Sequence, residues 1–382
     1  MAKLGDICIQ ITDGSHNPPM GVEQSNYLML SSKNIDDDHI TFNDPRYLSQ
    51  EDFEAENKRT NIKPNDLLIT IVGTIGRVAI VPNSLTEFCV QRSVAVLKPK
   101  PEMVYNRFLM YYLQNMRPYL EQESRGVAQK GIYLKQLSNL SIILPPLDEQ
   151  RKIAAALDKV SDLIAKRRQQ LDKLDELIKA RFVEMFGGIH NSLDFPYLPI
   201  KDFTSVISGG TPDRNSPRYW NSGEIKWVKT TELQNKVIND TEEKITREGL
   251  ENSSAKMVPA NTILIAMYGQ GKTRGMTGYL SVEASTNQAC ACILPSQKIN
   301  QKYLWQYMIL SYEKLRSLAK GGNQPNLNGA MIKNFPVLVP PIELQNQFAA
   351  FVEQTEKTKT AISRSLEKLE TLKKALMQEY FG

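Results

Sequence analysis

Residues 263–273 come nearest to a chemical site, because an apolar run there leads into Gly-Lys-Thr. Such a run is typical of a P-loop, in which backbone amides and a lysine bind nucleotide phosphates. The P-loop pattern requires a further glycine five positions before its last one, and Ala266 occupies that position. The segment is better explained as a glycine-rich loop that presents Lys272 and Arg274 outward. A nucleotide-dependent enzyme using the loop from Gly269 to Thr273 stays open as the alternative.

Three further signatures are weaker. Asn-Pro-Pro-Met at residues 17–20 is similar to the Asn-Pro-Pro-aromatic motif that holds a flipped base in amino-methyltransferases, but methionine cannot stack as an aromatic ring would. Cys290 and Cys292 share one face of a strand without nearby partner ligands, which favours core packing. The histidines have no acidic or nucleophilic partner at a suggestive spacing: His16, His39 and His190. We predict no catalytic and no metal-binding residues.

The polar loops hold side chains that can read DNA base edges. Arginine and lysine pair with guanine, asparagine and glutamine with adenine, and serine and threonine with either. The candidates in the first half are Ser15, His16, Asn17, Lys33, Asn34, Gly73, Thr74, Arg77, Gln91, Arg92, Arg125, Gln129 and Lys130. Those in the second half are Thr211, Arg214, Lys229, Thr230, Gln270, Lys272, Arg274, Asn287, Gln288, Lys320, Gln324 and Asn326.

The charge is small in total and uneven in place. The 382 residues carry a net charge of +5, which excludes a histone-like protein. Residues 188–342 account for +5, whereas residues 1–147 sum to −1 because acidic side chains crowd residues 36–56. Outside that acidic tract the first domain has 14 basic and 8 acidic groups. We therefore expect a basic face opposed by an acidic one, which would suit DNA binding.

Nothing in the sequence predicts a membrane span. The apolar runs are a few residues long, far below the roughly 20 needed to cross a bilayer. Four cysteines are too few for a disulfide framework, and the amino end lacks the apolar core of a secretory signal. We expect a cytoplasmic protein.

The chain contains an internal repeat. Residues 144–150 read Leu-Pro-Pro-Leu-Asp-Glu-Gln and residues 339–345 read Val-Pro-Pro-Ile-Glu-Leu-Gln, each followed by a long charged segment. An offset of 195 residues separates Pro145 from Pro340 and also Phe186 from Phe381. Upstream, residues 91–94 match 287–290 with a shift of one. Each half is therefore one globular domain followed by one helix.

The two charged segments have the apolar spacing of a coiled-coil seam, with alternating steps of four and three residues. Each helix of about 38 residues would be about 57 Å long, and such a helix could serve as a scaffold or a ruler. The seams break at different positions, which favours pairing of the two helices within the chain. The seam residues are Ile153, Leu157, Val160, Ile164, Leu171, Leu174, Ile178, Phe348, Val352, Ile362, Leu366, Leu369 and Leu376.

The globular halves combine strands with a few short helices, so the fold class is α+β. Period-two or fully apolar runs predict strands at residues 27–30, 67–72, 78–81, 94–97, 225–228, 263–267 and 289–294. Residues 105–115 and 303–312 predict helices.

The repeated domain, ending in Leu-Pro-Pro-Leu-x-Glu-Gln before a long helix, resembles the specificity (S) subunit of type I restriction-modification systems. The resemblance covers essentially the whole chain. One departure is that the second motif has Leu344 where the first has Glu149. It implies target recognition domain 1 at 1–147, spacer helix 1 at 148–187, target recognition domain 2 at 188–342 and spacer helix 2 at 343–382. The helices would pair antiparallel with pseudo-twofold symmetry.

The same resemblance implies a noncatalytic DNA-specificity subunit that reads a bipartite double-stranded target, one part per domain. Two modification (methyltransferase) subunits would dock on it, and restriction (translocase/nuclease) subunits would join the complex. S-adenosylmethionine, ATP and Mg would bind those partners and not this chain. A purely structural coiled-coil protein is a further alternative, and it predicts no salt-dependent DNA binding.

Overall fold

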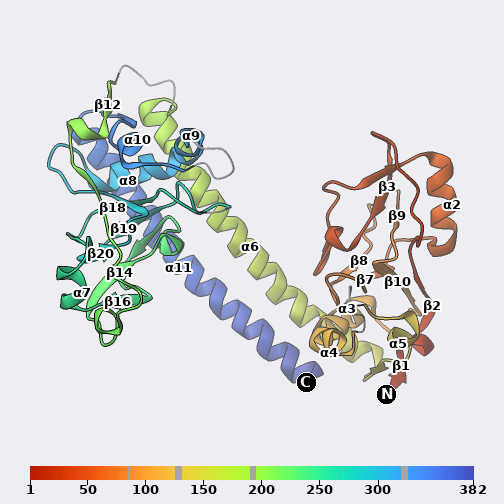
Figure 1. Cartoon of the computed structure of the whole chain (residues 1–382). Coiled ribbons are helices and arrows are strands. Elements are labelled where there is room, and N and C mark those ends of the chain that lie inside the picture. The colour runs from red at the N-terminus through yellow and green to blue at the C-terminus, as the bar shows by residue number, and fades with distance from the viewer. Residues whose placement is uncertain (85–86, 125–130, 190–194, 270, 320–325) are drawn as a thin grey trace. The chain divides into compact units, whose positions relative to one another are not determined.

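The computed structural model describes residues 1–84, 87–124, 131–189, 195–269, 271–319 and 326–382. The chain forms two compact units (Figure 1). Unit 1 comprises residues 1–168 and 364–382, and unit 2 comprises residues 169–363. Each unit thus joins one strand-rich domain to parts of both long helices, whereas the sequence-based division assigns one whole helix to each domain.

Unit 1 begins with short strands interspersed with a few short helical elements. These elements are β1 (Ala2–Lys3), α1 (Leu4–Ile7), β2 (Cys8–Asp13), β3 (Tyr27–Leu30), η1 (Ser32–Asn34), β4 (Ile35–Asp36), β5 (His39–Ile40), β6 (Arg46–Leu48), α2 (Gln50–Thr60), β7 (Leu67–Thr70), β8 (Val78–Ile80), β9 (Phe88–Val90) and β10 (Val94–Pro99). Helical elements and a short strand then lead to the first long helix: α3 (Asn106–Asn115), α4 (Arg117–Glu123), α5 (Leu134–Ser138), β11 (Ser141–Ile142) and α6 (Leu147–Phe186).

The central sheet of unit 1 has the order β2-β10-β7-β8 and is antiparallel. Successive side chains of β7 enter two different cores, as the period of two along a strand requires. Leu67 and Ile69 pack in the cluster that contains α3, and Leu68 packs toward the sheet β6-β3-β9. Because both faces are covered, β7 is buried at all four positions.

The elements of the second half of the chain follow a similar order with some additional short elements. They are β12 (Tyr197–Pro199), η2 (Ile200–Asp202), β13 (Val206–Ser208), η3 (Pro217–Tyr219), β14 (Ile225–Val228), η4 (Thr230–Glu232), β15 (Lys236–Ile238), β16 (Glu243–Ile245), α7 (Arg247–Glu251), β17 (Met257–Val258), β18 (Ile263–Ala266), β19 (Thr277–Leu280), β20 (Ala284–Thr286), β21 (Cys290–Ile293), α8 (Gln301–Leu310), α9 (Tyr312–Ser317), α10 (Gly329–Lys333), β22 (Pro336–Leu338) and α11 (Ile342–Phe381).

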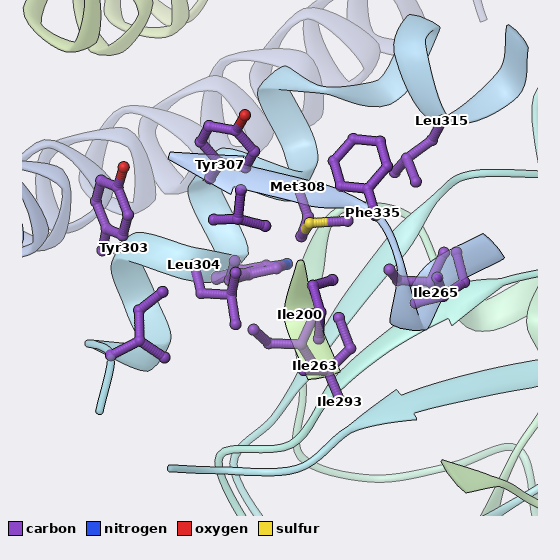
Figure 2. Close-up of a cluster of buried hydrophobic side chains, with 14 of the residues drawn as sticks. Ile200, Ile263, Ile265, Ile293, Tyr303, Leu304, Tyr307, Met308, Leu315 and Phe335 are labelled. Atoms are coloured by element: carbon purple, nitrogen blue, oxygen red, sulfur yellow. The ribbon is translucent and has the colours of Figure 1, made fainter. Parts of the chain in front are cut away.

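The central sheet of unit 2, β13-β21-β18-β19-β15, also separates two cores. Ile263 and Ile265 of β18 face the aromatic helix α8 (Figure 2). Cys290 and Cys292 enter the opposite core, where burial raises the pKa of the Cys292 thiol to about 11. Both cysteines therefore serve packing.

The predicted strands are present, with ends that differ by a few residues. Residues 27–30 and 225–228 match β3 and β14 in full, whereas β7 and β18 end before the predicted limits. The helix predicted to reach residue 312 ends at Leu310, where a turn at Ser311 separates α8 from α9.

The long helices α6 and α11 each have 40 residues and begin one residue before the predicted boundaries of 148 and 343. Gly187, with φ of 74°, ends α6 in the left-handed conformation that favours glycine. In unit 1 the end of α11 packs near the start of α6, and an ion pair of 2.8 Å joins Arg168 to Glu370. In unit 2 the end of α6 packs near the start of α11, where Phe182 contacts Phe348. The antiparallel pairing and the α+β class are confirmed.

All the predicted seam residues are buried or half-buried. Ile153, Leu157, Val160, Ile164, Ile178, Phe348 and Val352 are buried. Leu171, Leu174, Ile362, Leu366, Leu369 and Leu376 are half-buried. This burial is what knobs-into-holes packing of two helices produces.

The glutamine of the Pro-Pro motif holds each globular domain to its helix. Gln150 is fully buried, its Oε1 accepts from Tyr105 N at 2.8 Å, and its Nε2 donates to Pro145 O at 2.8 Å and to Met103 O at 3.2 Å. Gln345 is buried in the same way. Its bonds are Nε2 to Pro340 O at 2.7 Å and Asn300 N to Oε1 at 2.9 Å. The glutamine of the motif thus forms a joint between each globular domain and the long helix that follows it.

An ion pair reinforces this joint in both units. Arg107 of α3 binds Asp158 of α6, and Tyr111 donates to the same carboxylate at 2.7 Å. At the equivalent place in unit 2, Lys302 of α8 lies 2.8 Å from Glu353 of α11. Each strand-rich domain is therefore held to a helix by side chains at repeated positions.

Candidate nucleic-acid interface

Four loops meet at one end of the central sheet in unit 1. Three of them follow β2, β3 and β7, and the fourth connects β9 to β10. Hydrogen bonds join them: Ser15 N to Val90 O at 2.9 Å, Arg92 N to Ser15 O at 2.9 Å, Gln91 N to Leu30 O at 2.8 Å, Ile71 N to Ser93 O at 2.9 Å and Ser32 N to Ser93 Oγ at 3.1 Å. We call residues 14–20, 31–34, 71–77 and 91–93 the first loop cluster.

Unit 2 builds the same arrangement from residues 209–216, 229–232, 267–269, 271–276 and 287–289, which we call the second loop cluster. The matching hydrogen bonds are Gly210 N to Thr286 O at 2.8 Å, Asn287 N to Val228 O at 3.0 Å and Met267 N to Ala289 O at 2.8 Å. These bonds make Gln91 and Asn287 equivalent, as the sequence repeat predicts. Two loop clusters therefore share one backbone frame and differ in side chains.

A glycine forms the closest contact in each cluster. An ideal Cβ added to Gly14 would lie 1.8 Å from Val90 O, and one added to Gly209 would lie 2.1 Å from Thr286 O. Real Cβ atoms do not approach so closely. Only glycine lets the first loop of each cluster lie against the strand beside it.

Most of the described candidate residues lie in the two loop clusters and reach solvent. The exposed ones are His16, Asn17, Lys33, Gly73, Thr74, Arg92, Arg214, Lys272 and Gln288. The half-buried ones are Arg77, Gln91, Thr211, Lys229, Thr230, Arg274, Asn287 and Asn326, and the buried ones are Ser15 and Asn34. Arg125, Gln129, Lys130, Gln270, Lys320 and Gln324 lie outside the described residues.

Asn34 uses its amide inside the protein. Its Oδ1 accepts from Ser31 N at 3.1 Å and its Nδ2 donates to Asn43 O at 3.0 Å. Glu232 occupies the equivalent place in unit 2 and accepts from Lys229 N at 2.9 Å. This geometry gives Asn34 a role in shaping a loop rather than in presenting an amide to a base.

Side chains that sequence reasoning missed organise the second loop cluster. Arg214 stacks on Trp220 and binds Glu243, which also lies 2.8 Å from Lys229 Nζ. Hydrogen bonds to Glu243 and Glu242 raise the pKa of Lys229. Neither a tryptophan nor a glutamate distant in sequence carries a local signal that would mark it as part of this loop cluster.

Both halves of the chain match the family model described as "Type I restriction modification DNA specificity domain", over residues 24–176 and 194–373. The chain belongs to this family. The EcoR124I/EcoR124II specificity subunit of Escherichia coli is 22% identical over 295 residues, which are 74% of this chain and 72% of that protein. The MjaVIII specificity subunit of Methanocaldococcus jannaschii is 22% identical over 345 residues, covering 84% and 79%.

A solved structure agrees in fold with this specificity subunit. The crystal structure of the S subunit of the type I restriction-modification system from M. genitalium aligns with 100% of this chain and 95% of that chain, with a TM-score of 0.57 and 14% identity. The family match confirms the resemblance drawn from the sequence. The chain is a DNA-recognition subunit and not the catalytic one.

The charges of the specificity subunit differ from the sequence-based expectation. Four carboxylates of the acidic tract pair with basic residues of the first domain: Asp36 with Arg77 at 3.2 Å, Asp37 with Arg117, Asp38 with Arg107, and Asp44 with Lys33 at 2.6 Å. The predicted separation of a basic face from an acidic one is wrong for these groups. The fold brings together charges up to 80 residues apart, so counts along the sequence overstate the unpaired positive charge.

The nucleotide-binding alternative is also wrong. A P-loop joins a strand to a helix, whose amino terminus helps to hold the phosphates. In the specificity subunit, β18 leads through the loop into another strand, β19. Tyr312 donates to Lys272 O at 2.6 Å, and Arg316 donates to Arg274 O at 2.9 Å, so helix α9 holds the loop.

The described residues of the specificity subunit lack two other kinds of feature. No cluster of His, Cys, Asp or Glu in that part of the chain has the grouping of a metal site. Within the same residues, no helix is both long enough and apolar enough to cross a membrane.

Proposed function

We propose that this specificity subunit reads a bipartite double-stranded DNA target, with each loop cluster contacting one part. The observation that carries the proposal is the doubled loop cluster, in which one backbone frame presents two different sets of polar side chains. Gln91 and Arg92 in the first cluster correspond to Asn287 and Gln288 in the second. Different donors and acceptors at equivalent positions would select different bases, so the two parts of the target would differ in sequence.

The test is methylome mapping in cells that express this chain with its modification subunit, followed by binding of the complex to the mapped target. Arg92→Ala and Lys272→Ala remove exposed cations from the first and second loop clusters. Each variant is expected to reduce discrimination about tenfold to a hundredfold in one part of the target only, which is the effect of one lost base contact.

The control is Lys298→Ala, because Lys298 is exposed in unit 2 between β21 and α8, outside the second loop cluster. It is expected to leave both parts unchanged. A methylation motif without two separated parts, or an equal loss in both parts for either variant, would contradict the proposal.

We also propose that two modification subunits dock on repeated faces of the long helices. Residues 171–186 and 366–381 are identical at eight of sixteen positions, whereas residues 147–170 and 342–365 are identical at three of twenty-four. Five of the eight identical pairs are exposed in both helices: Lys173 and Lys368, Leu177 and Leu372, Lys179 and Lys374, Ala180 and Ala375, and Glu184 and Glu379.

The interior of the same segments is kept only in part: Leu171 and Leu174 of the seam recur as Leu366 and Leu369, but two other positions differ. Ile178 corresponds to Lys373, and Arg181 corresponds to Leu376. Packing of the two helices alone does not require identical side chains on their exposed faces. Five identical exposed pairs over a seam that is kept only in part are the pattern expected when each exterior fits the same partner surface, so we infer two copies of one partner.

Leu177→Glu and Leu372→Glu test this docking. The two leucines are 46% and 45% exposed, and covering one by a partner would contribute about 2 kcal/mol. Each variant is expected to weaken one of two binding events about thirtyfold, and the double variant both, in a titration that reports stoichiometry. Leu163→Glu is the matched control, because Leu163 is 38% exposed and its repeat counterpart is Thr358. Unchanged stoichiometry and affinity in the double variant would refute the docking faces.

The remaining parts of the proposal concern the complex. Restriction subunits would join the assembly, and S-adenosylmethionine, ATP and Mg would bind the partner subunits. The complex would act in the cytoplasm, on double-stranded DNA. A titration of this chain alone with S-adenosylmethionine or ATP is the direct check, and tight binding of either would contradict this division of labour.

A further inference from the structure

Arg214 of the second loop cluster lies against two tryptophans, Trp220 and Trp227, whose rings contact each other edge-to-face. Its guanidinium carbon lies 3.8 Å from the ring centroid of Trp220 and 4.7 Å from that of Trp227. The indoles are fixed to the loop that carries the arginine, because Trp220 donates to Asp213 O at 3.0 Å and Trp227 donates to Gly210 O at 2.9 Å. The position of the guanidinium is therefore set before any ligand arrives.

Glu243 joins two candidate DNA contacts through one carboxylate. It accepts from Arg214, and its other oxygen lies 2.8 Å from Lys229 Nζ. Glu242 adds a contact of 2.9 Å to the same lysine. The two cations and two carboxylates sum to zero charge, although Arg214 keeps 48% of its side chain exposed. The second loop cluster thus presents a cation whose charge is already balanced.

In unit 1 the position equivalent to Glu243 is Arg46, which also holds the first loop of its cluster but carries the opposite charge. Strand pairing places Glu243 beside Trp227 and places Arg46 beside Met29. Arg46 donates to Pro19 O at 2.6 Å in the first loop cluster. In both units this position holds the first loop of its cluster, but only unit 2 does so with a carboxylate bound to cations.

Charge balance and a fixed position of the guanidinium have different effects on the two kinds of DNA contact. Binding to phosphates depends on net positive charge and carries no sequence information. A guanidinium has five N–H donors, so Glu243 can occupy one edge while another edge remains for the two acceptors of a guanine. The arrangement disfavours the first kind of contact and retains the second.

We propose that Glu243 is a positioning and charge-masking residue, which makes the second loop cluster select a base sequence rather than bind any duplex. It orients Arg214 and Lys229 and cancels their attraction for phosphate. This inference rests on the proposed function, since it assumes that the second loop cluster contacts one part of the DNA target.

The experiment uses the complex of this chain with its modification subunits and two duplexes, the mapped target and the same duplex with the second part scrambled. Glu243→Gln keeps the size of the side chain and removes its charge. We expect affinity for the scrambled duplex to rise about fivefold and the slope of log K against log salt to steepen by about 1, as one cation becomes available to phosphate. Discrimination between the duplexes is expected to fall about tenfold.

The matched control is Glu248→Gln. Glu248 is an exposed carboxylate of unit 2 that lies 3.2 Å from Arg218, and neither residue is in our candidate DNA-contact set. It is expected to change neither affinity nor salt slope. An equal effect of both variants would reduce the role of Glu243 to net charge and overturn the inference. Equal weakening on both duplexes, with an unchanged slope, would overturn it as a loss of fold.

A failure of the proposed function can be distinguished from a failure of the role of Glu243. If the unmodified complex does not distinguish the mapped target from the duplex with a scrambled second part, the proposed function itself fails. If it does distinguish them and Glu243→Gln changes neither the salt slope nor the discrimination, only the inference about Glu243 is overturned.

Discussion

Replacing Gly209 with alanine is expected to lower the free energy of unfolding by about 3 kcal/mol and to abolish recognition by the second loop cluster. The added Cβ would lie 2.1 Å from Thr286 O and 2.2 Å from Thr286 Oγ1. The first atom belongs to the backbone of a buried strand and cannot move aside on its own. The loop must move instead, and it carries Thr211 and Arg214 away from their partners. Gly14→Ala is expected to act in the same way on the first loop cluster, because its Cβ would lie 1.8 Å from Val90 O.

Denaturant unfolding of each variant measures the loss of stability, and binding to half-scrambled duplexes measures the loss of recognition. Gly329→Ala is the control, since nothing lies within 4 Å of its Cβ at the start of α10. Gly14→Ala and Gly209→Ala should each affect only their own part of the target. Normal stability together with normal recognition in either variant would show that the loop does not need the close approach.

Replacing Gln150 with leucine is expected to destabilise unit 1 by about 3 kcal/mol, at about 1 kcal/mol for each of three lost hydrogen bonds. The change leaves Tyr105 N, Met103 O and Pro145 O without their partner at a buried joint. Leucine has a similar volume, so the loss arises from polar groups and not from a cavity. Gln345→Leu removes two bonds and is expected to cost about 2 kcal/mol in unit 2.

Hydrogen exchange gives a local measurement for these variants. The amide of Tyr105 should lose protection in Gln150→Leu, and the amide of Asn300 should lose it in Gln345→Leu. Gln354→Leu on α11 is the control, because Gln354 is exposed. Retained protection of the Tyr105 amide in Gln150→Leu would show that Gln150 does not hold the globular domain to its helix, whatever the change in global stability.

The repeat and the helices could be predicted because their signals are local. The seam residues recur every three or four positions over 40 residues. An apolar repeat with this period over such a length is characteristic of an α-helix. Strands such as β3 and β14 were predicted in full, since their apolar runs are bounded by turn residues. Other strands end at a different residue from the one predicted, because contacts with neighbouring loops determine where the last ladder hydrogen bond forms. Strand β7 is an example.

The candidate site was predictable only in part. Sequence comparison of the halves indicated which loops correspond, and backbone hydrogen bonds at Gln91 and Asn287 agree with that correspondence. The orientation of a side chain within a loop carries no such signal. Asn34 has a side chain that could pair with adenine, but its amide is hydrogen-bonded to Ser31 and Asn43 inside the protein. Whether the exposed candidates contact bases stays a prediction.

The sequence by itself determined that two similar domains alternate with two long helices and that the chain resembles a specificity subunit, because periodicity and repetition are written along the chain. Only the tertiary structure decided which charges remain available. The Asp36–Arg77 pair and the Arg214–Glu243 pair form between groups that the fold brings together from distant positions. Electrostatic interaction depends on distance in space and not on separation in sequence, so a count of charges could not assign a partner to any of them.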